Sequence, residues 1–215
     1  MPRCHCEATN RHFTPARARQ DLVTYQRRGP TGTARLILQG LRDVSLAADT
    51  VLDVGAGIGV LHHELLERGV QRAVHLEVAS AYLEAAQEET ARRGHQHRVH
   101  FHRGDITSLA PELASADLVT LDRVLCCSPD LEALIEVSAR KAKRYFALSY
   151  PHDYWYVRGR VRLQNARRRW TGDPFRFFVH PVHRIRSLIR AAGFQVRRAR
   201  WNLNWEVVIC TRDAM

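Results

Sequence analysis

Short apolar runs alternate with helix-like patterns through most of the chain. The runs lie at 50–54, 73–76, 99–102, 117–121 and 145–149. Their length and composition are typical of buried parallel strands. After the first run, Val60, Leu61, Leu65 and Leu66 recur at the spacing of one helix face. Strands that alternate with helices predict a parallel sheet with helices on both of its faces.

Helices are expected before, between and after these strands. They cover about 15–27, 34–38, 60–69, 80–93, 129–142, 154–170 and 182–192. The helix at 154–170 is arginine-rich and amphipathic, and its apolar content is Trp155, Val161, Leu163 and Trp170. We expect the fifth strand to stop at Pro151, since proline cannot donate to a ladder.

The last third of the chain departs from this alternation. Two strand-like runs, 194–201 and 205–211, are separated by only three residues. A connection this short joins antiparallel neighbours. The sequence therefore predicts an α/β three-layer sandwich with a mostly parallel, seven-stranded sheet and a C-terminal antiparallel hairpin. We expect a helical cap at 1–48 and the main domain at 49–215, with a helical insertion at about 152–175.

Length and composition narrow the class of protein. A chain of 215 residues suits one sizeable domain. Its first residues include no apolar signal core, and no stretch reaches the roughly 18 apolar residues of a membrane span. We therefore expect a cytoplasmic monomer or homodimer without a membrane partner. The five cysteines are odd in number, which argues against a disulfide framework.

The net charge of +11 raises the question of nucleic acid. Only Lys141 and Lys143 are lysines, so nearly all of the 33 basic residues are arginine. That ratio is typical of a GC-rich genome. The arginines are also scattered, and their densest run, 167–169, is short. A nucleic-acid partner therefore stays an alternative, with a small-molecule acceptor as the main expectation.

A glycine-rich turn follows the first strand. Gly55, Gly57 and Gly59 allow the backbone to turn tightly and to approach a ligand without side chains in the way. The following helix points free N–H groups into the same crevice. The dinucleotide pattern G-x-G-x-x-G requires a small residue at position 60, which is Val60. The pattern here is G-x-G-x-G.

The segment VLDVGAGIGVLHHELLERGV, at 51–70, resembles motif I of class I S-adenosylmethionine-dependent methyltransferases. The resemblance implies a Rossmann-like fold, S-adenosylmethionine as cofactor and S-adenosylhomocysteine as product. It places Glu77 on the ribose hydroxyls and Asp105 on the adenine amino group. The implied cofactor-binding residues are Asp53, Gly55, Ala56, Gly57, Gly59, Glu77, Val78, Gly104, Asp105, Ile106, Asp122, Arg123, Tyr25 and Arg28. An arginine such as Arg28 can bind the carboxylate of the methionine moiety bidentately.

The catalytic residues are expected at the ends of the fourth and fifth strands. Asp122 and Arg123 follow the fourth strand and should border the methyl group and the substrate, because ligands sit beside such ends. His152 is the first candidate base and His180 the second, with Asp122 as a further catalytic candidate. The N-P-P-Y motif of many enzymes that methylate nucleic-acid amines is absent.

Three further stretches carry a narrower resemblance. The runs ADLVTLDRVLCCSPD, SYPHDYWYVR and FFVHP are similar to small methyltransferases near the magnesium-protoporphyrin O-methyltransferase group. Several members of that group do not act on porphyrins, so the porphyrin is not carried over. We expect methyl transfer to an O, N or S nucleophile of a small, flat or aromatic acceptor. The alternatives are an RNA methyltransferase and a non-catalytic module that binds the cofactor.

Two cysteine clusters are candidates for metal or thiol sites. Cys4, His5, Cys6 and His12 have the side chains that bind soft metals, but the second ligand pair of a usual zinc site is missing. No metal is therefore predicted. The adjacent Cys126 and Cys127 could act as a thiol pair for a soft substrate. We favour the interpretation that both are small apolar side chains buried in the core.

Overall fold

The computed structural model describes residues 3–212, with side chains described from Cys6 onward. Its helices are α1 (Arg3–His12), α2 (Pro15–Arg28), α3 (Gly32–Asp43), α4 (Val60–Leu66), α5 (Ser80–Arg92), α6 (Ile106–Leu109), α7 (Leu131–Lys141), α8 (Trp155–Trp170) and α9 (Val182–Ala191). Two short 3-10 turns are η1 (Ala110–Glu112) and η2 (Leu125–Cys127). Its strands are β1 (Thr50–Val54), β2 (Arg72–Glu77), β3 (Val99–Arg103), β4 (Ala116–Leu121), β5 (Ala142–Pro151), β6 (Phe194–Trp201) and β7 (Trp205–Arg212).

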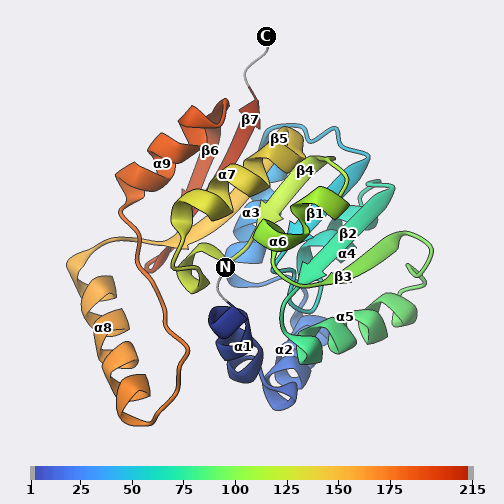
Figure 1. Cartoon of the computed structure of the whole chain (residues 1–215). Coiled ribbons are helices and arrows are strands. Elements are labelled where there is room, and N and C mark those ends of the chain that lie inside the picture. The colour runs from blue at the N-terminus through green and yellow to red at the C-terminus, as the bar shows by residue number, and fades with distance from the viewer. Residues whose placement is uncertain (1–2, 213–215) are drawn as a thin grey trace.

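The strands form one seven-stranded sheet in the order β3-β2-β1-β4-β5-β7-β6. Strands β1 to β5 are parallel, and β7 lies antiparallel between β5 and β6. The predicted α/β Rossmann-like sandwich with a C-terminal antiparallel hairpin is confirmed (Figure 1). The chain leaves β1 in one direction for β2 and β3 and returns on the other side for β4. The crevice outside the carboxyl ends of β1 and β4 is therefore the topological switch point, where this class of sheet binds ligands.

Alternate residues of the central strands pack on opposite faces of the sheet, as the pleat requires. On one face Leu52 belongs to a core shared with α7 and α9. On the other face Val51 belongs to a core shared with α3 and α4. A smaller apolar cluster joins α2 to α5 through Leu22 and Tyr82. The first two clusters, one on each face of the sheet, explain why the central strands are continuous apolar runs in the sequence.

The structure corrects three expectations about the elements. Pro151 belongs to β5 and pairs with Trp205. The pairing of β5 with β4 ends at Leu148, so Pro151 lies where the strand has one neighbour and a missing N–H is tolerated. Helix α1 was not predicted, because its residues are largely polar and carry no apolar period. The helix expected at 129–142 ends at Lys141, and Ala142 already begins β5.

Helix α8 begins one residue later than predicted and ends at the predicted residue, but its burial differs from the prediction. Its buried residue is Val157, which the sequence interpretation did not single out. Trp155, Leu163 and Trp170 are all exposed to solvent. In Figure 1, α8 projects away from the sheet at the lower left. Of the helices in the described part of the chain, none is long and apolar enough to cross a bilayer.

Candidate active site

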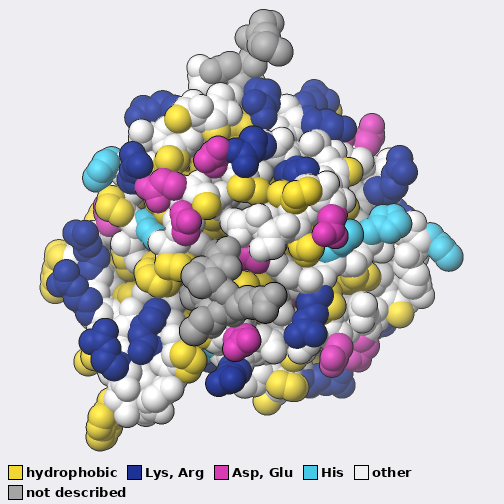
Figure 2. All heavy atoms as spheres, in the orientation of Figure 1, with side chains coloured by type: hydrophobic (Ala, Val, Ile, Leu, Met, Phe, Trp, Pro, Cys, Tyr) yellow, Lys and Arg dark blue, Asp and Glu magenta, His cyan; other side chains and the backbone are white. Residues whose placement is uncertain are grey.

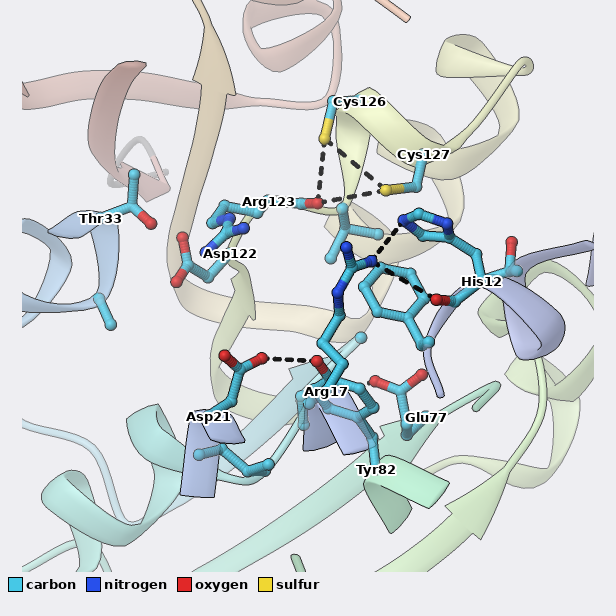
Figure 3. Close-up of a pocket in the computed structure, with 18 of the residues that line it drawn as sticks. His12, Arg17, Asp21, Thr33, Glu77, Tyr82, Asp122, Arg123, Cys126 and Cys127 are labelled. Atoms are coloured by element: carbon cyan, nitrogen blue, oxygen red, sulfur yellow. Dashed lines mark hydrogen bonds between the residues drawn. The ribbon is translucent and has the colours of Figure 1, made fainter. Parts of the chain in front are cut away.

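A cavity of about 710 Å³ opens at the carboxyl ends of β1, β2 and β4. Its floor is the glycine turn after β1 together with the residues that follow β2 and β4. One wall comes from the N-terminal helices α1, α2 and α3, and the other comes from α8 and the segment at 177–178. In Figure 3, labelled side chains from the N-terminal helices and from the segments after β2 and β4 surround a common space. The cavity therefore lies at the switch point of the sheet.

The glycine turn leaves no room for side chains at two of its positions. A Cβ on Gly55 would lie 2.6 Å from Val124 Cγ2, and one on Gly59 would lie 2.5 Å from His62 Cε1. Gly57 differs, since the nearest atom to its Cβ would be in the Tyr82 ring at 3.6 Å. All three glycines have positive φ. Gly57 therefore presents bare backbone to the cavity, while the other two make the turn possible.

Asp53, near the end of β1, links this strand to its neighbours β4 and α4. Its Oδ1 accepts a hydrogen bond from Thr120 Oγ1 at 2.6 Å, which ties β1 to β4. Its Oδ2 lies 3.1 Å from His62 Nδ1, which ties β1 to α4. The carboxylate is buried and its oxygens serve these partners. Asp53 thus shapes the floor of the cavity through the fold.

Glu77 lies at the end of β2 with its carboxylate against the glycine turn. Oε2 accepts from Gly57 N at 2.9 Å, and Oε1 accepts from Ala79 N at 2.8 Å. Burial raises the pKa of this carboxyl group, and the backbone donors act in the opposite direction. Each carboxylate oxygen retains acceptor capacity beyond its backbone partner. A ligand with two neighbouring hydroxyl groups could donate to both oxygens.

Asp105 caps a short helix and also borders the cavity. Its Oδ1 accepts from Thr107 N at 2.7 Å and from Thr107 Oγ1 at 2.6 Å, so it is the N-cap of α6. Its Oδ2 lies 4.0 Å from Cys6 Sγ of α1. Asp105 therefore has a local capping role through Oδ1, and the residue also lines the cavity.

Asp122 and Arg123 follow β4 and lie together in the cavity. Ser149 Oγ donates to Asp122 Oδ1 at 2.6 Å and accepts from Arg123 N at 2.8 Å. Burial raises the pKa of Asp122, although hydrogen bonds from Ser149 and Thr33 act in the opposite direction. Arg123 has a φ of 62°, a conformation that costs a non-glycine residue energy. Its guanidinium lies over the Trp205 ring at 5.6 Å.

The cavity brings together most of the residues that the sequence singled out. Those that line it are Tyr25, Asp53, Gly55, Ala56, Gly57, Glu77, Val78, Asp105, Asp122 and Arg123. Those that the described part of the chain places elsewhere are Arg28, Gly59, Gly104, Ile106, His152 and His180. Ile106 is part of the apolar core, and Gly59 is the N-cap of α4. Arg28 is the last residue of α2 and lies beyond the wall.

The two histidines expected to act as bases are not brought to the cavity. His152 Nε2 lies 3.1 Å from Asn202 O, and the imidazole is stacked on Tyr154. His180 Nε2 lies 3.1 Å from Leu125 O and 3.0 Å from Ser128 O. Carbonyl oxygens only accept, so these nitrogens carry protons and serve as structural donors. Both histidines brace the connections around the site.

Arg17 lines the cavity although the sequence analysis did not single it out. Arg17 of α2 lines the cavity one helical turn before Asp21, and its Nη1 lies 2.8 Å from His12 Nε2. His12 Nδ1 lies 3.0 Å from Arg168 Nη1 of α8. Burial, with Arg168 and Arg17 adding to it, lowers the pKa of His12 to about 4. The spacing of Arg17, Asp21 and Thr24 on one helix face was the signal available in the sequence.

Three cysteines also line the cavity, namely Cys6, Cys126 and Cys127. The Sγ atoms of Cys126 and Cys127 are 3.7 Å apart, and both lie near the carbonyl oxygen of Arg123. Within the side chains described, no group of three or more histidine, cysteine or acidic residues has an arrangement that could hold a metal ion. The side chains of Cys4 and His5, from the other cluster that was weighed, lie outside the described residues.

Residues 51–144 match the family model of a methyltransferase domain. No curated protein matches the chain by sequence. Magnesium protoporphyrin IX methyltransferase from Synechocystis PCC 6803, solved with bound SAH, is 20% identical with a TM-score of 0.67 and covers 84% of this chain and 82% of that chain. An O-methyltransferase family protein from Burkholderia thailandensis is 18% identical with a TM-score of 0.65, over 85% of this chain and 57% of that chain.

Human N-acetylserotonin methyltransferase, solved in complex with SAM, is 16% identical with a TM-score of 0.65 and covers 94% of this chain and 58% of that chain. At these identities the solved structures establish the shared fold. The family model covers the part of the chain that carries the glycine turn, Glu77, Asp105 and Asp122. The segment that matches the family model therefore supplies the floor of the cavity.

Proposed function

We propose that this class I S-adenosylmethionine-dependent methyltransferase methylates a nucleophilic group of a small, flat acceptor that carries an acidic substituent. The observation that carries the proposal is the single cavity with two unlike halves. One half has bare glycine backbone and carboxylates, and the other has aromatic rings and arginines.

The cofactor half suits S-adenosylmethionine. Gly57 offers backbone to the ligand, and Glu77 offers two carboxylate oxygens of the kind that ribose hydroxyls require. Asp105 also lines the cavity with a carboxylate of the kind that an adenine amino group would need. Arg17 replaces Arg28 as the cation proposed for the methionine carboxylate, because it lines the cavity. When bound, the cofactor supplies a methyl group on a positively charged sulfur.

The acceptor half lies between η2 and α8. Phe177, Phe178 and Trp205 line it, and flat rings of this kind favour a planar acceptor. Arg160 and Arg168 of α8 line the same region. Arg168 has a buried Nε without a hydrogen-bond partner, although its Nη1 pairs with Asp173. That nitrogen is enclosed by protein, so the positive charge that Arg160 and Arg168 bring to the cavity wall is what would attract a carboxylate or similar anion on the acceptor.

Asp122 is the residue proposed to take the acceptor's proton. It lines the cavity, and Ser149 holds its orientation through Oδ1. Its pKa, raised by burial, brings the carboxylate closer to the proton affinity that a general base requires. Proximity and in-line orientation in the closed cavity supply the remainder of the acceleration.

The proposal is tested by label transfer from methyl-labelled S-adenosylmethionine into a host-cell extract, followed by separation by size. Label in the low-mass, anionic fraction is the expected result. Label in RNA would favour the alternative in which the arginines bind nucleic acid, and that binding should fall steeply with salt. Absence of label from every fraction, with cofactor binding demonstrated, would favour a non-catalytic module.

A further inference from the structure

The outward side of α8 carries an apolar stripe with no partner in the described part of the chain. Trp155, Leu163 and Trp170 have exposed fractions of 85%, 73% and 89%. At 100° per residue, these three and the intervening Gly159 and Ala166 fall within a sector of about 80°. We call these five residues the outer stripe.

The opposite side of the same helix faces the cavity. Val157, Val161, Gln164 and Arg168 line the cavity and fall on the other half of the helical wheel. The side of α8 that packs on the protein is therefore the opposite side, and the outer stripe is a second apolar surface that faces solvent. Helix α8 thus lines the cavity with one side and exposes two tryptophans to solvent on the other.

Arginines border the outer stripe on both of its edges. On the helical wheel Arg158, Arg162 and Arg169 lie along one edge, and Arg167 lies along the other. The helix contains no acidic residue. Figure 2 shows dark-blue and yellow side chains gathered side by side over the α8 region at the lower left of the molecule. The surface is both strongly basic and apolar.

The apolar surface continues onto the β6–β7 connection. Trp201 and Leu203 have exposed fractions of 68% and 75%. Tyr156 Oη donates to Leu203 O at 2.6 Å, which fixes this connection beside the first turn of α8. The exposed apolar residues at this end therefore come from two elements held together by a hydrogen bond.

We propose that α8 lies flat on an anionic membrane surface, with the outer stripe inserted at the level of the lipid headgroups. An apolar stripe flanked by arginines, with tryptophans at its ends, is the pattern of an interfacial helix. The helix has 16 residues and is about 24 Å long, which suits docking in the plane of the membrane. Anionic lipid complements both the charge and the apolar area.

The same features disfavour other occupants. A second copy of this chain would bring like-charged arginines face to face along the stripe, which is repulsive. The phosphates of a nucleic acid would pair with the arginines, but they would make no favourable contact with the exposed Leu163 between two tryptophans. If the outer stripe docks on the membrane, the opposite side of α8 and the acceptor half of the cavity lie directly above the lipid surface.

The test is flotation of the purified full chain with vesicles of phosphatidylcholine containing about a third phosphatidylglycerol, compared with pure phosphatidylcholine. We expect binding to the anionic vesicles that weakens with salt and a blue shift of tryptophan emission. The triple variant Trp155→Ser, Leu163→Ser, Trp170→Ser should bind at least tenfold more weakly. The variant Arg162→Gln, Arg169→Gln should bind roughly 25-fold more weakly, since each surface arginine contributes about a factor of five.

Arg140→Gln on α7, an exposed arginine away from α8, is the matched control and should bind like the wild type. Circular dichroism and affinity for S-adenosylhomocysteine should be unchanged in every variant, because the substituted side chains are exposed and do not line the cavity. Equal binding by the triple variant and the wild type would overturn the proposal. So would preferential binding to an RNA oligonucleotide, or a wild-type dimer that the triple variant abolishes.

Discussion

Asp122 carries the acid–base part of the proposal at the scale of single residues. In Asp122→Asn the hydrogen bond with Ser149 can remain, while the proton acceptor is lost. We expect kcat to fall by about 10²–10⁴-fold and affinity for S-adenosylhomocysteine to change little. Steady-state kinetics and calorimetry measure the two quantities. Asp43→Asn, at a partly exposed ion pair with Arg200, is the control.

The pH profile gives a second readout of the same group. Burial raises the pKa of Asp122 above its ordinary value of 3.8. The base form is therefore lost as pH falls through that raised pKa, and kcat/KM should decline on the acid side. The Asn variant should lack this limb. An unchanged acid limb in Asp122→Asn would assign the proton transfer to another group.

Arg17 and Arg28 of α2 provide a matched pair for the proposed carboxylate contact. Arg17 lines the cavity and Arg28 does not. Arg17→Gln should weaken S-adenosylhomocysteine binding by about tenfold or more, as the loss of a charged hydrogen bond does. Arg28→Gln should leave the affinity at the wild-type value. Equal affinities of the two variants would remove Arg17 from the cofactor site.

For single residues, the sequence predicted the location correctly where a side chain lies at the carboxyl end of a central strand. Glu77 and Asp122 were found in this way, and both line the cavity. His152 and His180 were placed near the site by the same reasoning, but neither lines the cavity, and a backbone carbonyl engages the Nε2 of each. Arg17 was missed because its spacing with Asp21 and Thr24 marks one face of α2, but the packing of that face over the cavity shows only in the structure.

At the scale of elements, β2 and α4 share a group of buried histidines. His75 of β2 is fully buried, and both of its ring nitrogens are without a hydrogen-bond partner. Burial lowers the pKa of His75, and burial with nearby cations lowers that of His63 to about 2. The unfolded chain therefore binds protons below pH about 6.5 that the folded chain does not bind.

Stability should consequently fall as pH drops below about 6.5, by roughly 1.4 kcal/mol per pH unit for each such histidine. His75→Leu removes one of these groups together with its unsatisfied nitrogens. We expect it to raise the free energy of unfolding by about 1–3 kcal/mol at pH 7 and to flatten the acid slope. Urea denaturation at pH 7 and pH 5 measures both effects.

The exposed variant His97→Gln is the control for this experiment and should leave stability unchanged at both pH values. A loss of stability in His75→Leu would mean that the imidazole makes a favourable buried interaction. Equal acid slopes in wild type and His75→Leu would show that other groups take up the protons.

The parallel strands were predictable because burial on both faces makes them short apolar runs. Helix α1 was not, since its order depends on packing over the cavity. Ala8 is its buried residue, and His12 stacks on Phe175 at 4.1 Å. The place of Pro151 in β5 also depends on tertiary context, because it follows from where the pairing with β4 ends.

At the scale of the whole molecule, the cavity is assembled from segments far apart in the sequence. The glycine turn is its floor, and α2 and α8 form opposite walls. Binding of S-adenosylhomocysteine should therefore slow amide exchange in the turn at 55–59 and in α2, and leave α9 unchanged. Hydrogen-exchange mass spectrometry measures this. Protection confined to the turn would mean that α2 takes no part in cofactor binding.

The sequence could not show how this assembly is made. Net charge and scattered arginines looked like a property of composition, yet Arg17, Arg123, Arg160 and Arg168 converge on one cavity. That convergence follows from the three-dimensional placement of α2, β4 and α8. The cap expected at 1–48 stays a prediction, and it is supported by residues of α1 and α2 that line one wall of the cavity.

The most direct test of the account is calorimetric titration of S-adenosylhomocysteine into the wild type, Glu77→Ala and the exposed control Glu88→Ala. We predict binding to the wild type and the control, and at least tenfold weaker binding to Glu77→Ala, whose carboxylate lies at the cavity floor. Thermal unfolding of each variant separates loss of the site from loss of the fold. No binding to the wild type, or equal affinity in the folded Glu77→Ala variant, would contradict the assignment of this cavity to the cofactor.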